Sequence, residues 1–321
     1  MILQISGATV PQVYQEALWA MRINGVEEES RNGPVLVIPH PVMLEITWPW
    51  NRVLFDPVRD ANPFFHFMEF VWMMAGSNDA EWISMFNKRM MEYADDGVLR
   101  GAYGWRWCHP TSQIKHTIDL LKIDSLTRQA VITMWYPLYD DYRANTSDRP
   151  CNTHIYFRAI ENRLDMTVCN RSNDLIWGML GSNVVHFTML HELISRAIGY
   201  EQGIYRVFSH NLHFYTEMPR GSDILKGVAV HDPYRNNKVS AYPLLQEDEN
   251  WTMLVADCKA LVDGSFLVPH DFRSQWMQNV GFPIYEAYLT KEDRDYRIPD
   301  IQASDIRLAC QEWSLRHKKS S

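Results

Sequence analysis

The pattern of apolar and polar positions predicts helices and strands in mixed order along the chain. Residues 11–21 and 114–122 repeat apolar side chains with the period of an amphipathic helix, and Pro11 suits the first turn of its helix. Further helices are expected near residues 246–264 and 303–316. Stretches with the composition or alternation of strands occupy residues 35–48, 130–135, 153–159, 164–170 and 204–208.

Two segments are almost entirely apolar and predict buried helices. Asn62 and Pro63 provide a capping residue and a first-turn proline for a helix over residues 64–76, which Gly76 ends. Residues 184–199 have helical periodicity with apolar side chains on several faces. We therefore expect this second helix to run through the centre of the protein.

The order of these elements indicates the fold class. Strands and helices do not alternate strictly, which favours an α+β or irregular α/β fold with a mixed β-sheet flanked by helices. No internal repeat and no linker rich in Gly, Ser or Pro divides the sequence. Residues 1–321 are therefore predicted to form a single domain.

Composition and charge narrow the class of protein. Hydrophobic residues make up 46% and charged residues 22%, as in packed globular proteins. The net charge of −8 argues against a general affinity for nucleic acid or an anionic membrane, so a bound phosphate would need a few well-placed arginines. The sequence lacks a run of about 18 apolar residues and a secretory signal pattern, so we expect a cytoplasmic protein that does not span a membrane.

The sequence contains none of the common motifs of dinucleotide-binding proteins, ATP-binding proteins, zinc proteases or serine hydrolases. The five irregularly spaced cysteines are typical of reduced thiols. The remaining candidate functional residues lie in segments 149–157, 170–183 and 208–215. Each segment alone has an ordinary explanation, because Cys151 could be a small core residue and the others a polar turn and a half-exposed strand. The histidines near Cys151 lack the carboxylate or cysteine partners of a metal site, so no metal is expected.

In combination, these segments resemble the thymidylate synthase family, which includes the deoxycytidylate hydroxymethylases of phages. The resemblance extends from about Arg31 to Tyr215, and it implies a thymidylate synthase-like fold and a homodimer packed sheet to sheet. Its most specific blocks are Pro150-Cys151, Arg171-Ser172-x-Asp174-x-x-x-Gly178 and His213-x-Tyr215. Two earlier blocks also match, namely the helix with Glu69 and Trp72 and the block Gly101-Ala102-Tyr103-Gly104-x-x-Trp107.

The family's chemistry explains the need for a reactive cysteine. The resemblance implies that carbon 5 of a pyrimidine nucleoside monophosphate receives a one-carbon unit from 5,10-methylenetetrahydrofolate. Carbon 5 becomes nucleophilic when a thiolate adds to carbon 6, and Cys151 stands in the nucleophile position. Glu69 resembles the general acid and base, and Tyr103 the residue that orients groups around the thiol. We expect Arg171 to favour the thiolate form of the cysteine.

The resemblance also implies a set of binding residues, because a phosphate dianion calls for guanidinium groups and a hydroxyl. The residues in matching positions are Arg31, Arg171 and Ser172 for the phosphate, His213 and Tyr215 for the sugar 3′-hydroxyl, Asn183 for the base, and Asp174 with Gly178 for the folate. In the family an arginine pair also reaches the phosphate from the other subunit of the dimer. Here Arg128 keeps one of these two places and Gln129 holds the other.

Three departures from thymidylate synthase point to a hydroxymethyl product. Asn152 follows the nucleophile where the synthases have histidine. Met90 stands at the cofactor-facing position where they have a tryptophan that shields the one-carbon intermediate. The sequence ends in SLRHKKSS and not in a short apolar segment that closes the site. An opened, wetter site favours attack by water on the exocyclic methylene carbon over hydride transfer from tetrahydrofolate.

The base and the sugar stay open at this point. Asn183 can pair with uracil or, with its amide turned, with cytosine. Asn152 argues against the usual uracil network, so the sequence favours dCMP or CMP slightly over dUMP, although the deoxycytidylate hydroxymethylases have Asp at the position of Asn183. The alternatives are a thymidylate synthase that methylates dUMP and an inactive nucleotide-binding regulator with the same fold. A purely structural protein would require Cys151 to be buried and remote from Arg171.

Overall fold

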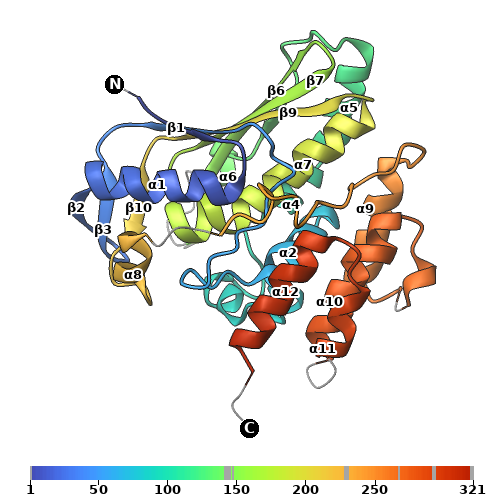
Figure 1. Cartoon of the computed structure of the whole chain (residues 1–321). Helices are drawn as coiled ribbons and strands as arrows, with labels where there is room; N and C mark the ends of the chain where they lie inside the picture. The colour runs from blue at the N-terminus through green and yellow to red at the C-terminus, as the bar shows by residue number, and fades with distance from the viewer. Residues whose placement is uncertain are drawn as a thin grey trace.

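A computed structural model describes residues 2–140, 146, 148–227, 231–266, 268–290 and 294–318. Its helices and strands form a mixed α+β architecture, which confirms the predicted fold class (Figure 1). Within the described ranges, no helix has the length and apolar character that crossing a membrane requires.

The strands form two sheets with both parallel and antiparallel pairs. The six-stranded sheet has the order β1 (Leu3–Gly7), β4 (Val42–Ile46), β9 (Glu201–Ser209), β7 (Arg163–Asn170), β6 (Asn152–Ile160) and β5 (Val131–Thr133). In this sheet the pairs β1–β4 and β7–β9 are parallel and the others antiparallel. The four-stranded sheet has the order β2 (Val26–Ser30), β3 (Gly33–Ile38), β10 (Leu212–Tyr215) and β8 (Asn173–Asp174).

Helices α1 (Val10–Asn24) and α7 (Asn183–Ala197) pack on the six-stranded sheet, and most elements after β10 are helical. The α-helices are α1 (Val10–Asn24), α2 (Pro63–Met74), α3 (Ala80–Ser84), α4 (Tyr103–Cys108), α5 (Gln113–Ile123), α6 (Pro137–Asp140), α7 (Asn183–Ala197), α8 (Gly221–Lys226), α9 (Trp251–Val262), α10 (Phe282–Leu289), α11 (Arg294–Arg297) and α12 (Ser304–Arg316). Short 3-10 turns cover Lys88–Tyr93, Pro269–Asp271 and Ile298–Asp300, and π-type turns cover Leu175–Ser182 and Met277–Gly281.

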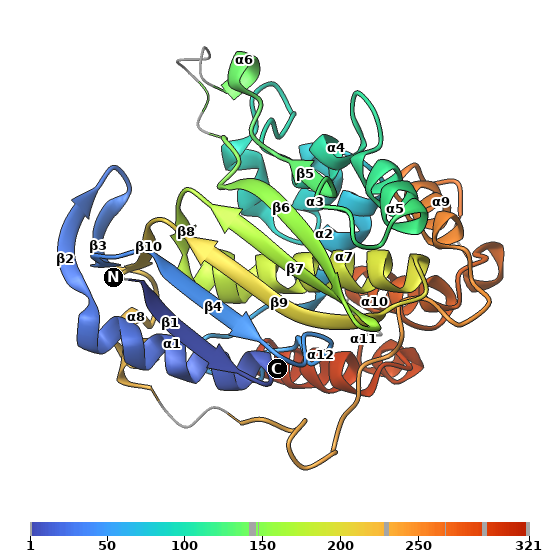
Figure 2. The same cartoon turned by 90° about the horizontal axis from the view of Figure 1, so that it is seen from above.

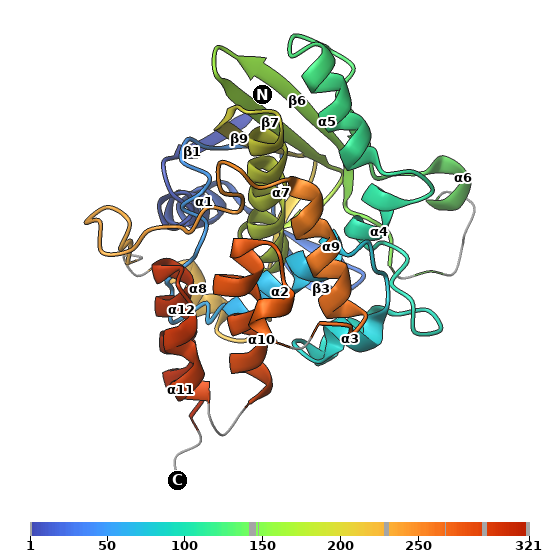
Figure 3. The same cartoon turned by 90° about the vertical axis from the view of Figure 1, so that its right-hand side faces the viewer.

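The two apolar helices predicted from the sequence form the centre of the molecule. Asn62 caps α2 by accepting a hydrogen bond from Phe65, and Gly76 ends this region with a φ of 68°. Helix α7 is buried along nearly its whole length and packs on β7 and β9. Helices α9, α10 and α12 pack against α2 on the side away from the sheet (Figure 3).

Strand pairing brings the functional segments together at one end of the larger sheet. Cys151 immediately precedes β6 and Arg171 immediately follows β7, and these neighbouring strands pair so that Asn152 lies opposite Asn170. The backbone N–H of Arg171 donates to the carbonyl of Cys151 at 3.0 Å. The smaller sheet adds β8 and β10 at the same end (Figure 2). Residues more than 60 positions apart in the sequence therefore face one cleft.

Candidate active site

A cleft of about 590 Å³ lies between the end of the larger sheet and the smaller sheet. Seven residues predicted from the sequence line it, namely Arg31, Cys151, Arg171, Ser172, Asp174, His213 and Tyr215. The other lining residues are Glu28, Glu29, Ser30, Asn32, Val35, Val37, Trp135, Thr146, Arg149 and Asn211. The fold thus gathers one thiol, three guanidinium groups and several hydrogen-bonding side chains around a single space.

Cys151 lies beside the guanidinium group of Arg171. The distance from Nη2 of Arg171 to Sγ of Cys151 is 3.9 Å. Burial raises the pKa of the Cys151 thiol. The charge of Arg171 lowers this pKa, as does that of Arg31, whereas Asp148 and Asp174 raise it. The two arginines therefore offset part of the cost of ionising a buried thiol. This proximity contradicts the interpretation of Cys151 as a remote structural cysteine.

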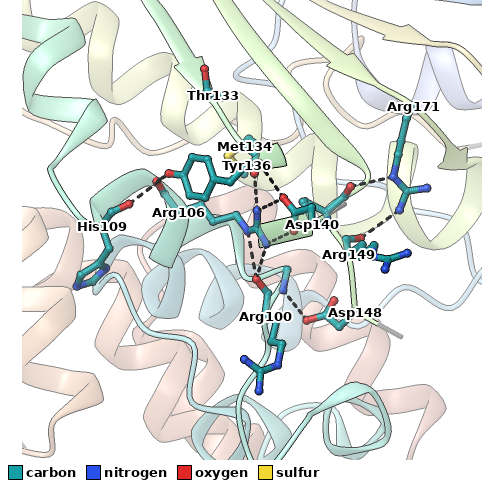
Figure 4. Close-up of polar contacts among 12 residues, drawn as sticks. Arg100, Arg106, His109, Thr133, Met134, Tyr136, Asp140, Asp148, Arg149 and Arg171 are labelled. Atoms are coloured by element: carbon teal, nitrogen blue, oxygen red, sulfur yellow. Dashed lines mark hydrogen bonds and ion pairs between the residues drawn. The ribbon is translucent and has the colours of Figure 1, made fainter. Parts of the chain in front are cut away.

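The guanidinium of Arg171 is held by the backbone of the segment that carries the cysteine. Its Nε donates to the carbonyl of Pro150 at 3.1 Å and its Nη2 to the carbonyl of Arg149 at 3.2 Å (Figure 4). The same guanidinium lies 5.6 Å from the ring centroid of Trp135. These contacts fix a cation beside the thiol without neutralising it, because both acceptors are carbonyl groups.

A buried ion pair and a hydrogen bond connect residues that precede Cys151 in the sequence to α4 and its N-terminal side. Arg106 is fully buried and forms a bidentate pair with Asp140 at 2.7 and 2.8 Å. It also donates to the carbonyl of Arg100 at 2.8 Å, while Asp148 accepts from the backbone N–H of Gly101 at 2.7 Å (Figure 4). Asp140 is thereby tied to α4, and Asp148 to the residues just before this helix.

Tyr103 and Asn152 lie directly behind the nucleophile. The hydroxyl of Tyr103 accepts a hydrogen bond from the backbone N–H of Asn152 at 3.4 Å. Asn152 is buried, and its Nδ2 donates to the carbonyl of Cys169 at 2.8 Å on the neighbouring strand. Asn152 does not line the cleft.

Asp174 and His213 face each other where β8 pairs with β10. Oδ1 of Asp174 accepts from the backbone N–H groups of Ile176 and Trp177, but its buried Oδ2 has no hydrogen-bond partner among the described residues. Burial raises the pKa of Asp174. Nδ1 of His213 lies 2.9 Å from Oδ1 of Asn211, which assigns the proton to Nδ1 and leaves Nε2 as an acceptor.

Glu69, Asn183 and Gly178 do not line the cleft, although Gly178 lies beside the cleft residue Asp174. Burial raises the pKa of Glu69 to about 8, and a hydrogen bond from Ser182 lowers it. A Cβ on Gly178 would lie 2.9 Å from Oδ1 of Asn173 and 3.4 Å from Nδ2 of Asn183, so only glycine fits beside these two amides.

Two predicted residues lie apart from the cleft. Arg128 is exposed in the loop before β5 and does not line the cleft of its own chain. Met90 is half-buried in the turn Lys88–Tyr93, also outside the cleft lining. The neighbouring Arg89 stacks on Trp177 at 5.6 Å, which places the turn against the segment that follows Asp174.

Several cleft residues were missed from the sequence. Trp135, Arg149 and Asn211 line the cleft, but none was singled out as a site residue. Trp177 is 44% exposed and lies between Arg89 and Arg59, whose guanidinium is 4.5 Å from the indole centroid. The sequence signal for Arg149 and Asn211 was their place in the segments 149–157 and 208–215, and the signal for Trp177 was its position next to Gly178.

The arrangement agrees with comparisons to known proteins. The family profile described as "Thymidylate synthase" matches residues 59–237. Three similar proteins are named deoxyuridylate hydroxymethyltransferase. That of Pseudomonas phage M6 is 38% identical over 98% of this chain and 94% of its own length. Those of Bacillus phage SP01 and Delftia phage PhiW-14 are each 35% identical over 66% of this chain, covering 58% and 62% of their own lengths. The chain therefore belongs to the thymidylate synthase family.

Proposed function

We propose that this one-carbon transferase is a deoxyuridylate 5-hydroxymethyltransferase that uses 5,10-methylenetetrahydrofolate in the cytoplasm. The observation that supports it most is the placement of Cys151 3.9 Å from Arg171 in a cleft that also contains Arg31, His213 and Tyr215. A thiol, a phosphate clamp and sugar-binding side chains in one space are what addition to carbon 6 of a nucleotide requires. The test is the identity of the product formed from dUMP.

The choice of uracil changes the slight preference for cytosine drawn from the sequence. That preference depended on Asn152 replacing the histidine of the synthases. The Asn152 amide bonds to the carbonyl of Cys169 inside the sheet, so this residue itself selects neither base. The M6 relative, which aligns over 98% of this chain, is named for deoxyuridylate. Asn183 can donate to O4 and accept from N3–H of uracil, so it serves as base reader in this proposal.

The residues next to the cleft fit a folate. Asp174 has a buried oxygen without a partner, which a pterin N–H group would satisfy. Beside it, the half-exposed indole of Trp177 and the small Gly178 provide a flat surface for an aromatic ring. Methylenetetrahydrofolate would supply the one-carbon unit, and Asp174 and Gly178 would hold its pterin.

The chain's own groups would act in a fixed order. Arg31, Arg171 and Ser172 bind the phosphate, while His213 and Tyr215 bind the sugar hydroxyl. Sγ of Cys151 then adds to carbon 6 of the base, which places electron density on carbon 5. Carbon 5 would then bond to the one-carbon unit that methylenetetrahydrofolate supplies. Glu69 removes the proton from carbon 5, and tetrahydrofolate would leave as the exocyclic carbon becomes a methylene group. The hydroxyl of Tyr103 accepts from the backbone N–H of Asn152 and so holds the segment that carries Cys151. Water adds to the methylene carbon, and the bond between Sγ of Cys151 and carbon 6 breaks to release the hydroxymethylated nucleotide.

Water access to the exocyclic carbon decides between a hydroxymethyl and a methyl product. Replacing Met90 with tryptophan should raise the ratio of methylated to hydroxymethylated nucleotide, because a larger apolar side chain excludes water. Chromatography of the products from dUMP measures this ratio. Met91→Trp, at an exposed neighbouring position, is the matched control. An unchanged ratio in Met90→Trp would show that Met90 does not face the one-carbon unit.

We also propose a homodimer packed through the outer face of the six-stranded sheet. None of the described helices crosses this face, and α1 and α7 lie on the opposite side (Figure 2). Phe208 and Met43 are paired neighbours on it, and Tyr156 is 44% exposed. Apolar side chains on an uncovered sheet favour association. Such a dimer would allow Arg128 to reach the partner's phosphate site.

Tyr156→Asp should convert this dimer to a monomer, because it buries a charge at the proposed interface. Sedimentation velocity measures the change, and activity should fall with it if Arg128 acts across the interface. Ile123→Asp, at an 83% exposed position on α5, should leave the dimer intact. A monomeric wild-type protein would contradict the proposal.

A further inference from the structure

A buried histidine lies directly behind the acid/base residue proposed above. His186 on α7 is 1% exposed, and its Nε2 is 3.3 Å from Oε2 of Glu69. The same Nε2 is 3.2 Å from the backbone carbonyl of His66, one turn before Glu69 on α2. The imidazole nitrogen therefore has two oxygen atoms within reach, one on a carboxyl group and one on a carbonyl.

The chemistry of these neighbours determines which nitrogen carries the proton. Burial lowers the pKa of His186 to about 3, so the ring is neutral and has a single N–H group. A carbonyl oxygen only accepts hydrogen bonds, so the contact with His66 requires the proton on Nε2. Oε2 of Glu69 is buried and has no hydrogen-bond partner among the described residues. The Nε2–H group of His186 thus lies near two acceptors: it satisfies the carbonyl of His66 and leaves Oε2 of Glu69 without a hydrogen bond.

We propose that His186 is a positioning residue for Glu69. The Nε2–H group of His186 donates to the His66 carbonyl when Glu69 is protonated, and to the Glu69 carboxylate when Glu69 is ionised. A hydrogen bond to a charged acceptor is about twice as strong as one to a neutral acceptor, so ionisation of Glu69 would attract the donor. The carbonyl then provides the resting partner, and the buried N–H is satisfied in both states. This inference rests on the proposed role of Glu69 in proton transfer.

The surroundings of Glu69 contain few competing groups. Burial raises the pKa of Glu69, and the hydroxyl of Ser182 lowers it. Among the described residues, no charged group on a helix packed against α2 shifts this pKa. His66 is also neutral, because burial and the nearby charge of Arg59 lower its pKa. Ser182 and His186 are therefore the protein groups positioned to stabilise the Glu69 carboxylate.

The first test follows the His186 N–H in the wild-type enzyme. In protein labelled with nitrogen-15 at histidine, the Nε2–H resonance of His186 should shift with a midpoint near pH 8, because burial raises the pKa of Glu69 to about 8. The shift should be absent in Glu69→Gln. A resonance that is insensitive to pH in this range would overturn the proposal. The measurement needs no substrate, so its result does not depend on which nucleotide the enzyme uses.

The second test removes the donor. His186→Phe keeps a ring of similar size and should raise the pKa of Glu69 by about one unit, measured by infrared titration of its carboxyl group against Glu69→Gln. His186→Gln retains an N–H donor, so the pKa of Glu69 in this variant should stay close to its value in the wild-type protein. His191→Phe is the matched control, because His191 lies on the same buried helix and bonds to Leu164. An unchanged Glu69 titration in both His186 variants would contradict the proposal.

Loss of catalysis alone would not decide the question. If the wild-type enzyme leaves dUMP unmodified while the His186 resonance follows Glu69, the proposed substrate is wrong and the pairing stands. If dUMP is hydroxymethylated and the resonance is constant, the substrate stands and the pairing is wrong. Should His186→Phe fail to fold, the wild-type titration still gives a result.

Discussion

Replacing Cys151 with alanine should abolish hydroxymethylation while dUMP still binds. The expected fall in kcat is roughly four orders of magnitude or more, the range seen when a covalent nucleophile is removed. Binding should survive because Arg31, Arg171, His213 and Tyr215 contact the phosphate and sugar and not the reacting carbon in the proposed complex. Single-turnover kinetics and calorimetric titration with dUMP measure the two quantities separately.

A second cysteine provides the control for this prediction. Cys108 on α4 is also half-buried but does not line the cleft, so Cys108→Ala should retain activity. Turnover that persists in Cys151→Ala would remove the nucleophile assignment. Loss of dUMP binding in the same variant would instead show that the thiol contributes to the fold of the site.

Glu69→Gln should lower kcat by about 10²- to 10⁴-fold, the usual contribution of a general acid or base. Burial raises the pKa of Glu69 to about 8, so the carboxyl group is mainly protonated at neutral pH. The carboxylate is the form that removes the proton from carbon 5, so wild-type activity should rise as the pH increases through about 8. The glutamine variant should lack this rise, since its amide does not titrate.

The pH profile of kcat measures this effect, with Glu16→Gln on the exposed face of α1 as control. Exchange of the carbon 5 proton of dUMP with solvent should be slowed in Glu69→Gln to the same extent. A variant that keeps both the pH dependence and the exchange rate would show that another group performs the proton transfer.

Elements with strong local signals were predicted well from the sequence. The capped helix α2 and the apolar helix α7 agree with expectation, because capping residues and helical periodicity are local features. Strand β2 was missed because four of its five residues are exposed, so it shows no alternation of burial. Helix α10 was missed because Gly281 and Pro283 interrupt its pattern after a π-type turn.

The cleft residues were found only through the family resemblance, since their spacing in sequence does not reveal that β6, β7, β8 and β10 meet. His186 could not be identified in this way, because a buried histidine on an apolar helix looks like a core residue. Its relation to Glu69 depends on the contact between α2 and α7. Arg128 poses a different problem, because its proposed site belongs to a second copy of the chain.

The most direct test of the account is the product formed with methylenetetrahydrofolate. The enzyme should be incubated separately with dUMP, dCMP and CMP, and the nucleotides analysed by mass spectrometry. We expect a hydroxymethyl increment on dUMP together with release of tetrahydrofolate. A hydroxymethyl increment on dCMP or CMP would correct the base or the sugar. A methyl increment on dUMP with formation of dihydrofolate would contradict the proposed attack by water and make the enzyme a thymidylate synthase.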